Sequence, residues 1–422
     1  MLFISALSRH HTEMTVKTSY PKEKIKVLLL EGIHPNADEL FTGEGFQVES
    51  LKASPPKAEL IEKIRTAHIL GIRSKTHLTD DILREGKKLL SVGCFCIGTN
   101  QVDLASANRH GIPVFNAPFS NTRSVAEMVI AEIIFLARQL GDRSREVHEG
   151  VWKKVANSCF EIRGKTLGIV GYGHIGNQVS VMAESMGMRV LYFDVVSKLT
   201  IGNAKACGSL EELLGKSDFV TLHVPELAST KGLMGKSQIR KMKSGGYLIN
   251  ASRGSVVDVP ALAEAIKDGH VAGAAVDVYP EEPAGNNEKF MSELQGLPNV
   301  ILTPHIGGST EEAQASIGVE VATSLIRFVN EGATTGAVNF PRIEMPSDPG
   351  AHRILNIHRN VPGVLKDVNR IVSDLNANIR RQTLSTDQEI GYLIMDLDQN
   401  VASQVRDAVE ALPTSIRTRI LF

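Results

Sequence analysis

The sequence predicts an α/β protein in which a doubly wound parallel sheet is inserted into a first α/β domain and a smaller C-terminal domain follows. Three observations lead to this prediction. Strand and helix patterns alternate through most of the chain, a glycine-rich turn follows an apolar strand near residue 171, and a short strand and helix series follows a Pro-rich segment near residue 345. Such alternation favours parallel sheets that are covered by helices.

The first domain is predicted from the alternation at the start of the chain. Strand patterns lie at Lys26–Leu30, Ile69–Ile72, Leu90–Val92 and Pro113–Phe115, and helical patterns at Lys57–Ala67 and Asp80–Glu85. This order predicts a flavodoxin-like sheet. A longer helix is expected from about Ser124 to Leu140, ending at Gly141; because it is apolar on most faces, we expect it to be buried between domains.

The most specific motif is the turn after the strand Thr166–Val170. Gly171 permits a tight reversal, Gly173 lets the backbone approach a pyrophosphate, and Gly176 lets the next helix pack closely on its strand with its N-terminus toward the phosphates. Asp194, which ends the next strand, can accept hydrogen bonds from both ribose hydroxyls and would repel a 2′-phosphate. The motif therefore predicts a Rossmann-type domain that binds NAD.

Further strand patterns extend the cofactor domain, and a helix then returns the chain to the first domain. The strands are expected at Arg189–Phe193, Phe219–His223, Gly246–Asn250, Gly273–Asp277 and Val300–Leu302, and the helix at Glu311–Val329. The first domain is therefore expected to be discontinuous. We predict a disordered extension at 1–22, a substrate-binding domain at 23–120 and 310–341, and an NAD-binding domain at 121–309.

A polar segment at 342–350 is predicted to be a linker, and residues 351–422 to form the C-terminal domain. Its patterns follow the order strand, helix, strand, strand, helix, strand, at Arg353–Ile357, Gly363–Leu375, Asn378–Ser385, Ile390–Asp396, Val401–Ala411 and Ser415–Leu421. This is a ferredoxin-like βαββαβ order, which leaves a sheet edge open for pairing with another copy. The domain has no titrating cluster, which indicates regulation or assembly.

The composition excludes several classes of partner. The 46 basic and 47 acidic residues give a net charge of −1, so there is no electrostatic reason to expect nucleic acid or an anionic membrane as a partner. The four cysteines (Cys94, Cys96, Cys159 and Cys207) form neither a disulfide scaffold nor a zinc site, which favours the reducing cytoplasm. No run is long enough to span a bilayer. A start at Met14 would omit the first thirteen residues, and an organelle presequence is the alternative.

Three residues at strand ends form a candidate catalytic set: Arg253, Glu282 and His305. A guanidinium can grip a carboxylate through two hydrogen bonds and polarise a neighbouring carbonyl. Oxidation of a hydroxy acid needs a base for the hydroxyl proton, and the imidazole of His305 titrates in the right range. A Glu282 carboxylate on the far ring nitrogen would fix the tautomer and raise the pKa of His305.

These segments resemble the signatures of the D-isomer-specific 2-hydroxyacid dehydrogenases, and the C-terminal unit is similar to an ACT domain. The resemblance covers about residue 24 to 422 and implies that Arg253, Glu282 and His305 are catalytic. The cofactor contacts, which include the glycine turn, are Gly171, Gly173, His174, Ile175, Gly176, Asp194, His223, Val224, Pro225, Ala251, Ser252, Asp277, Gly307 and Gly308.

The substrate contacts that the resemblance implies are Arg73, Ser74, Lys75, Asn121 and Gln314, and Lys154 is a further candidate. Relatives often have arginine where Lys75 stands, so bidentate phosphate binding is lost there.

The resemblance implies oxidation of 3-phospho-D-glycerate by NAD to 3-phosphohydroxypyruvate, the first step of phosphorylated L-serine biosynthesis, with 2-oxoglutarate as a second substrate of the reverse reaction in some relatives. It also implies an L-serine effector site at His358, Asn360 and Asn378, although relatives often have arginine at Val361, and a homotetramer. No metal is expected. Two alternatives stay open: a glyoxylate or hydroxypyruvate reductase, and an NAD-sensing corepressor-like binding protein.

Overall fold

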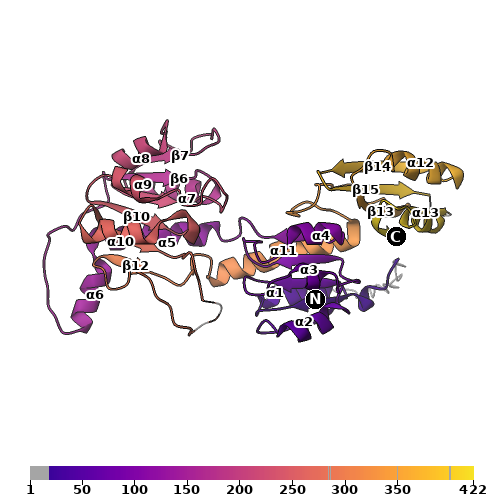
Figure 1. Cartoon of the computed structure of the whole chain (residues 1–422), viewed down its shortest axis with the longest axis horizontal. Helices are drawn as coiled ribbons and strands as arrows, with labels where there is room; N and C mark the ends of the chain where they lie inside the picture. The colour runs from indigo at the N-terminus through magenta and orange to yellow at the C-terminus, as the bar shows by residue number, and fades with distance from the viewer. Residues whose placement is uncertain (1–18, 284, 286, 349, 399–400) are drawn as a thin grey trace, which may run out of the picture. The chain divides into compact units, whose positions relative to one another are not determined.

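The computed structural model describes residues 19–283, 285, 287–348, 350–398 and 401–422 (Figure 1). Most of the predicted N-terminal extension, including residues 1–13, and Pro349 of the predicted linker lie outside the described residues. The chain forms two compact units, Met1–Ala117 with Gly318–Phe422 and Pro118–Ile317. The second boundary falls within one continuous helix, α11 (Glu311–Glu331). The short 3-10 helix η1 (Lys22–Lys24) precedes the first strand.

The first unit contains a five-stranded parallel sheet in the flavodoxin-like order β2-β1-β3-β4-β5. The strands are β1 (Lys26–Leu29), β2 (Gln47–Ser50), β3 (Ile69–Ile72), β4 (Ser91–Cys94) and β5 (Val114–Asn116). The helices of this part are α1 (Pro35–Gly43), α2 (Lys57–Ile64), α3 (Asp80–Leu83) and α4 (Leu104–Arg109). A core of fully buried side chains, among them Leu70 and Val92, holds sheet and helices together.

The sequence patterns missed β2, α1 and α4. Strand β2 is polar and largely exposed at the edge of its sheet, so it lacks the apolar alternation that marks a buried strand. Helix α1 begins with a proline at its first position and a His34 side chain that accepts a hydrogen bond from the Asn36 N–H at 3.3 Å. Helix α4 is only six residues long.

The long helix of the second unit ends earlier than the sequence indicated. Helix α5 spans Thr122–Arg138, and Gln139 takes the left-handed conformation (φ 52°) that ends it. Gly141 does not terminate α5, because it lies inside the next helix, α6 (Leu140–His148). The buried face of α5 packs into the core of its own unit together with α7.

The second unit is a doubly wound domain. Its seven parallel strands have the order β12-β11-β10-β9-β6-β7-β8. Strands β7 and β8 are added on one side of β6 and strands β9 to β12 on the other, so the topological switch point lies between β6 and β9. The strands are β6 (Thr166–Val170), β7 (Arg189–Phe193), β8 (Lys205–Ala206), β9 (Phe219–Leu222), β10 (Gly246–Asn250), β11 (Val271–Val276) and β12 (Val300–Leu302). The remaining helices are α7 (His174–Ser185), α8 (Leu210–Lys216), α9 (Lys236–Lys241), η2 (Gly254–Val256) and α10 (Val259–Lys267).

Successive residues of each strand face opposite layers of this unit. In β10, Ile249 packs in the layer of α5 and α7, whereas Leu248 packs in the layer of α8, α9 and α10. Both side chains are fully buried. Because both faces of the sheet are covered, its central strands β6, β9, β10 and β11 are buried almost throughout rather than at alternate residues.

The C-terminal domain forms an antiparallel sheet in the order β14-β15-β13-β16, the ferredoxin-like arrangement that was predicted. It consists of β13 (His352–Arg359), α12 (Val364–Asp374), β14 (Ile379–Thr386), β15 (Ile390–Leu397), α13 (Ala402–Glu410) and β16 (Ser415–Leu421). Strand β14 lies at one edge of the sheet, and its residues are exposed or half-buried.

Buried and half-buried polar side chains attach this domain to the end of helix α11. The Arg353 guanidinium binds both oxygens of the Asp396 carboxylate, at 2.7 and 2.9 Å, and donates to the backbone oxygen of Glu331 at 2.9 Å. Arg419 donates to the Val329 oxygen at 2.9 Å, and the Tyr392 hydroxyl to the Gly332 oxygen at 2.7 Å. These donors satisfy carbonyls at the helix terminus that have no partner within the helix.

Asp396→Asn is expected to lower the free energy of unfolding by about 3–5 kcal/mol, because it leaves the buried Arg353 charge without its counter-ion. Chemical denaturation of the full chain measures this change. Asp398→Asn is the matched control, since Asp398 pairs with Arg380 at the surface. Equal, small effects of the two substitutions would contradict the assignment of Arg353 and Asp396 as an anchoring pair.

Candidate active site

The glycine turn after β6 has the close contacts that its predicted roles need. Gly171 has φ +93°, and a Cβ atom there would lie 2.3 Å from the backbone oxygen of His223. A Cβ at Gly176 would lie 2.3 Å from the Gly171 oxygen, so only glycine lets α7 approach its strand this closely. At Gly173, by contrast, a Cβ would meet nothing within 4 Å. The space beside Gly173 is therefore open to a ligand.

Helix α7 begins at the end of this turn. Its first residues, His174 and Ile175, follow directly on Gly173, so their backbone amides lie at the helix N-terminus, where anions bind. The Phe119 ring lies against the His174 ring with centroids 3.9 Å apart. Open space, unpaired amides and a helix N-terminus fit the pyrophosphate of a dinucleotide.

The Asp194 carboxylate is held in place by backbone amides. Its Oδ2 accepts from the Tyr172 N–H at 2.8 Å, and its Oδ1 from the Val196 N–H at 2.9 Å. Each carboxylate oxygen can accept a second hydrogen bond, so the group remains able to bind ribose hydroxyls.

The remaining predicted cofactor contacts follow strands that end at the same edge of the parallel sheet. His223, Val224 and Pro225 follow β9, Ala251 and Ser252 follow β10, Asp277 follows β11, and Gly307 and Gly308 follow β12. Burial lowers the pKa of His223 to about 4, so its ring is neutral at pH 7. The Thr221 hydroxyl lies 3.0 Å from Nε2 of this ring.

His305 and Glu282 form a hydrogen-bonded pair at this edge. His305 Nδ1 lies 2.8 Å from Glu282 Oε2, and the other carboxylate oxygen accepts from the Tyr279 N–H at 3.1 Å. The hydrogen bond that His305 donates to the Glu282 carboxylate raises the pKa of His305. Burial alone would raise the pKa of Glu282, but hydrogen bonds from His305 and Tyr279 outweigh it, so the pKa is lowered. The His305 side chain is 51% exposed, which leaves Nε2 accessible.

Asp277 holds the loop that carries His305. Its buried carboxylate accepts hydrogen bonds from the Thr303 hydroxyl at 2.6 Å, the Ile306 N–H at 2.8 Å and the Gly307 N–H at 2.9 Å. Its backbone oxygen accepts from the His305 N–H at 2.8 Å. His305 takes the strained left-handed conformation (φ 55°), which this network maintains.

Arg253 lies next to the same pair. A Cβ on Gly254 would lie 1.9 Å from the carbonyl carbon of Tyr279, so the loop of Arg253 packs directly on the loop of Glu282. Asn250 fixes the Arg253 loop: its side chain donates to the Arg253 oxygen at 3.0 Å and accepts from Ser252 Oγ at 2.8 Å. The charge of Arg253 acts on the pKa values of both Glu282 and His305. The structure thus brings the three predicted catalytic residues together.

Two of the predicted substrate contacts lie in the same unit as the catalytic residues. The Gln314 side chain donates to the Gly308 oxygen at 3.0 Å. Asn121 is 8% exposed and lies against Gly308, where an added Cβ would meet Asn121 Nδ2 at 2.5 Å. Lys154, the further candidate, is exposed in the segment after α6.

Arg73, Ser74 and Lys75 follow β3 in the other unit. The Glu31 carboxylate accepts from the backbone N–H groups of this loop: Arg73 at 3.2 Å, Lys75 at 2.9 Å and Thr76 at 2.8 Å. Glu31 itself has φ 64°. Glu31 and Thr303 were not predicted, because each contacts a loop distant in sequence and no local pattern marks such a contact. Asn250 was not predicted either, although its contacts with Ser252 and Arg253 are local.

The three predicted effector residues do not meet within one chain. His358 lies opposite Gly391 in β15, and Asn360 follows at the same end of the sheet, where its N–H donates to the Glu389 oxygen. Asn378 precedes β14 at the opposite end, where Ile379 pairs with Leu397. His358 is also 3% exposed, with Nδ1 2.9 Å from Asn356 Oδ1.

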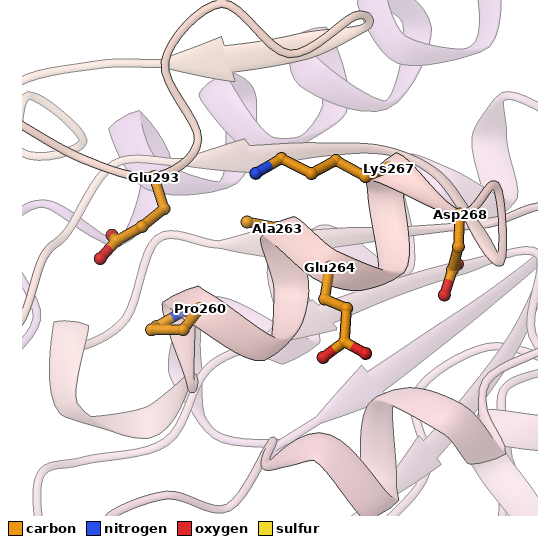
Figure 2. Close-up of a pocket in the computed structure, with 6 residues that line it drawn as sticks. All are labelled: Pro260, Ala263, Glu264, Lys267, Asp268 and Glu293. Atoms are coloured by element: carbon orange, nitrogen blue, oxygen red, sulfur yellow. The ribbon is translucent and has the colours of Figure 1, made fainter.

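No other site emerges from the described part of the chain. It contains no group of His, Cys, Asp and Glu side chains that would bind a metal, and no helix long and apolar enough to cross a membrane. Figure 2 shows a shallow pocket on the outer side of α10, lined by Pro260, Ala263, Glu264, Lys267, Asp268 and Glu293. None of the predicted site residues lines this pocket.

Comparison with known proteins agrees with this geometry. Residues 130–307 match the model of the D-isomer specific 2-hydroxyacid dehydrogenase NAD binding domain, and residues 354–417 match an AHAS small subunit-like ACT domain. The chain is 56% identical to D-3-phosphoglycerate dehydrogenase of Dictyostelium discoideum over 97% of this chain and 100% of the relative. It is 51% identical to D-3-phosphoglycerate dehydrogenase of Escherichia coli strain K12, over 96% and 100%.

A solved structure shows the same fold over the first two domains. The D-lactate dehydrogenase of Aquifex aeolicus, complexed with NAD and lactic acid, superimposes with a TM-score of 0.65 at 28% identity, covering 75% of this chain and 99% of that one.

Fold and site together define an NAD-dependent dehydrogenase of the D-isomer-specific 2-hydroxyacid class with a C-terminal ACT domain. Within this class, the chain belongs to the D-3-phosphoglycerate dehydrogenase family.

Gly171→Ala and Gly173→Ala are expected to separate folding from cofactor binding. Alanine at Gly171 combines a positive φ with a backbone clash and should lower the free energy of unfolding by about 1–3 kcal/mol. Alanine at Gly173 should leave stability unchanged within about 0.5 kcal/mol but weaken NADH binding, because the methyl group enters the open space. Thermal unfolding and NADH fluorescence titration measure the two effects. Unchanged NADH binding by Gly173→Ala would contradict the cofactor site.

Proposed function

We propose that this protein oxidises 3-phospho-D-glycerate to 3-phosphohydroxypyruvate with NAD, the first step of phosphorylated L-serine biosynthesis. The observation that carries the proposal is the His305 and Glu282 pair beside Arg253, at the edge of the sheet that binds NAD. The relatives that match nearly the whole chain are named D-3-phosphoglycerate dehydrogenases, which supports the choice of substrate.

In this proposal His305 is the base. Nε2 of its neutral ring accepts the proton of the C2 hydroxyl while the hydride on C2 leaves for the cofactor, so the C2 alcohol becomes a carbonyl. The bound nicotinamide supplies the hydride acceptor. The resulting imidazolium is stabilised by the Glu282 carboxylate, 2.8 Å from the opposite ring nitrogen. In the reverse direction the same imidazolium returns the proton, and we expect equilibrium to favour the hydroxy acid.

Arg253 orients the substrate. Its guanidinium donates to the Ser252 oxygen at 2.7 Å and has further N–H groups for the substrate carboxylate and the C2 oxygen. In the transition state, negative charge develops on that oxygen, and a fixed cation beside it lowers the barrier.

The cations of the other unit suit the phosphate. We propose that Arg73, Ser74 and Lys75 bind it, with their loop held by Glu31, and that Asn121 and Gln314 also contact substrate. Lys75 offers a point charge rather than a planar fork. The second carboxylate of 2-oxoglutarate resembles the phosphate in charge, so we also propose slow reduction of 2-oxoglutarate. The alternative reductase and corepressor functions are not favoured, because the relatives match through the ACT domain as well.

We further propose that L-serine inhibits the enzyme at a paired ACT domain. If β14 pairs antiparallel with β14 of a second copy, twofold symmetry brings Asn378 of one copy to the end of the sheet where Asn360 and His358 of the other lie. The effector would then complete the contact between two copies.

A second contact would make the assembly a homotetramer. The segment after α6 exposes apolar side chains that a monomer has no reason to expose: Trp152 is 83% exposed, Val151 49% and Val155 46%.

We place the enzyme in the cytoplasm, because its four cysteines are all thiols.

The function is tested by NADH formation from 3-phosphoglycerate, with and without millimolar L-serine. His305→Ala should lose at least about 10²-fold in kcat. Activity that serine lowers would support both chemistry and effector site, whereas activity indifferent to serine would remove the roles of His358, Asn360 and Asn378. No turnover in either direction, with NADH still bound, would favour a binding protein.

Glu282→Gln should shift the pH dependence as well as the rate. The negatively charged Glu282 carboxylate raises the pKa of His305, and a neutral amide removes this charge, so the pKa of His305 should fall. Oxidation needs neutral His305; the acid limb of kcat should therefore move to lower pH, although kcat itself falls about 10²-fold or more. Glu281→Gln is the neighbouring control. An unmoved acid limb would show that Glu282 does not act through His305.

A further inference from the structure

A buried carboxyl group without a partner lies in helix α5 of the NAD-binding domain. Glu132 is 5% exposed, and neither of its side-chain oxygens has a hydrogen-bond partner among the described residues. An ionised carboxylate in such surroundings costs several kcal/mol, so a buried acid without a counter-ion takes up a proton. Burial, followed by the charge of Asp277, raises the pKa of Glu132 to about 8.

The surroundings of Glu132 are apolar except at the carboxyl end of strand β11, where Asp277 lies. Helix α5 packs against α6, α7, β10, β11 and β12. The apolar residues of this layer include Val129, Ile133, Leu136, Ile249, Ala275 and Ile301. The charged group that acts on Glu132 is Asp277, which follows β11. The pKa of the Tyr279 phenol is raised mainly by burial, next by Asp277 and Glu282, and to a smaller extent by Glu132.

The other titratable groups on these elements do not act on Glu132. They are Arg123, Glu127 and Arg138 on α5, Asp142, Arg143, Arg145, Glu146 and His148 on α6, His174 and Glu184 on α7, and Tyr247 on β10. In the described part of the chain, therefore, no cation compensates a charge on Glu132.

Asp277 and Glu132 differ in the number of hydrogen bonds that their carboxyl groups accept. The Asp277 carboxylate accepts three hydrogen bonds, from Thr303, Ile306 and Gly307, which stabilise its ionised form. Glu132 accepts none. Asp277 faces helix α5, since a Cβ on Gly307 would lie 3.1 Å from Asp277 Oδ2 and 3.2 Å from Met128 Cε of that helix. A buried carboxyl group without hydrogen-bond donors keeps its proton, so Glu132 is uncharged.

We propose that Glu132 is a positioning residue: as an uncharged acid, it leaves Asp277 the single negative charge of this layer, and Asp277 then holds the loop that carries His305. This inference rests on the proposed function, in which His305 is the base. It assigns a role to a side chain that contacts neither substrate nor cofactor.

Ionisation of Glu132 would weaken the site at alkaline pH. A second negative charge beside Asp277 repels its carboxylate, loosens its bonds to residues 303–307 and frees the left-handed backbone of His305. The sign for stability follows from the same shift. The pKa is raised on folding, so the contribution of Glu132 is fully present below its unfolded pKa of 4.5 and is lost as pH rises to about 8.

The test uses the full chain with three substitutions. Glu132→Gln and Glu132→Met remove the titrating group, the first with nearly the same shape and the second without buried polar atoms. Glu127→Gln is the matched control, since Glu127 lies on the same helix but pairs with Arg123 at the surface. Thermal unfolding, and kcat and KM for both substrates, are measured from about pH 6 to about pH 9.5.

Wild type and Glu127→Gln should lose roughly 5 °C in Tm between pH 6 and 8 relative to both Glu132 variants. Their kcat should fall up to about tenfold per pH unit above about pH 8, a limb absent from the Glu132 variants. A wild-type minus Glu132→Gln infrared difference spectrum at pH 6.5 should contain the carbonyl band of a protonated carboxylic acid.

Two outcomes overturn the proposal. If the band is absent and the Tm profiles coincide, Glu132 is not a buried neutral acid. If Tm responds but the alkaline limb of kcat persists in both variants, Glu132 is neutral without positioning the His305 loop. Failure of the proposed function is distinguishable, because wild type would then lack turnover while Tm and the infrared band would still report on Glu132.

Discussion

The catalytic arrangement depends on one buried carboxylate, that of Asp277. It accepts hydrogen bonds from three groups of the loop after β12, and its backbone oxygen accepts from the His305 N–H. A polar group of this kind is costly to bury unless it is fully bonded, and here the bonds fix a backbone conformation that His305 would not adopt alone. The geometry of the His305 and Glu282 pair follows from that constraint.

Close backbone packing provides the second constraint. Gly171, Gly176 and Gly254 each lie where an added Cβ would meet backbone atoms at 2.3 Å or less, and together they bring the cofactor turn, the α7 terminus and the Arg253 loop into place. Glycine at these positions is a steric requirement of the fold. Gly173 differs, because the space beside it is open and its requirement comes from the ligand.

The ACT domain uses a different principle, since arginine side chains rather than glycines attach it. Arg353 and Arg419 donate to carbonyls at the end of helix α11, and Asp396 neutralises Arg353. Helix α11 is continuous from Glu311, which follows the His305 loop in sequence, to this attachment. The proposed effector edge at β14 reaches the same pair, because Arg381 lies 2.9 Å from the Asp396 carboxylate.

The sequence by itself determined the fold class, the cofactor and the catalytic residue types, because these are written in local patterns: apolar runs, a glycine turn, and polar residues that follow strands. It placed Arg253, Glu282 and His305 at strand ends, and parallel strands gather their ends at one edge. Only the tertiary structure decided which side chains hold those residues. Glu31, Thr303 and Glu132 act across loops or layers, where no sequence period exists. The left-handed Gln139 rather than Gly141 ends α5, because the chain enters α6 at once. The effector residues come from two segments that lie at opposite ends of one sheet. Strands β13 and β14 are both antiparallel to β15 and so run parallel to each other, which places the end of β13 and the start of β14 at opposite ends.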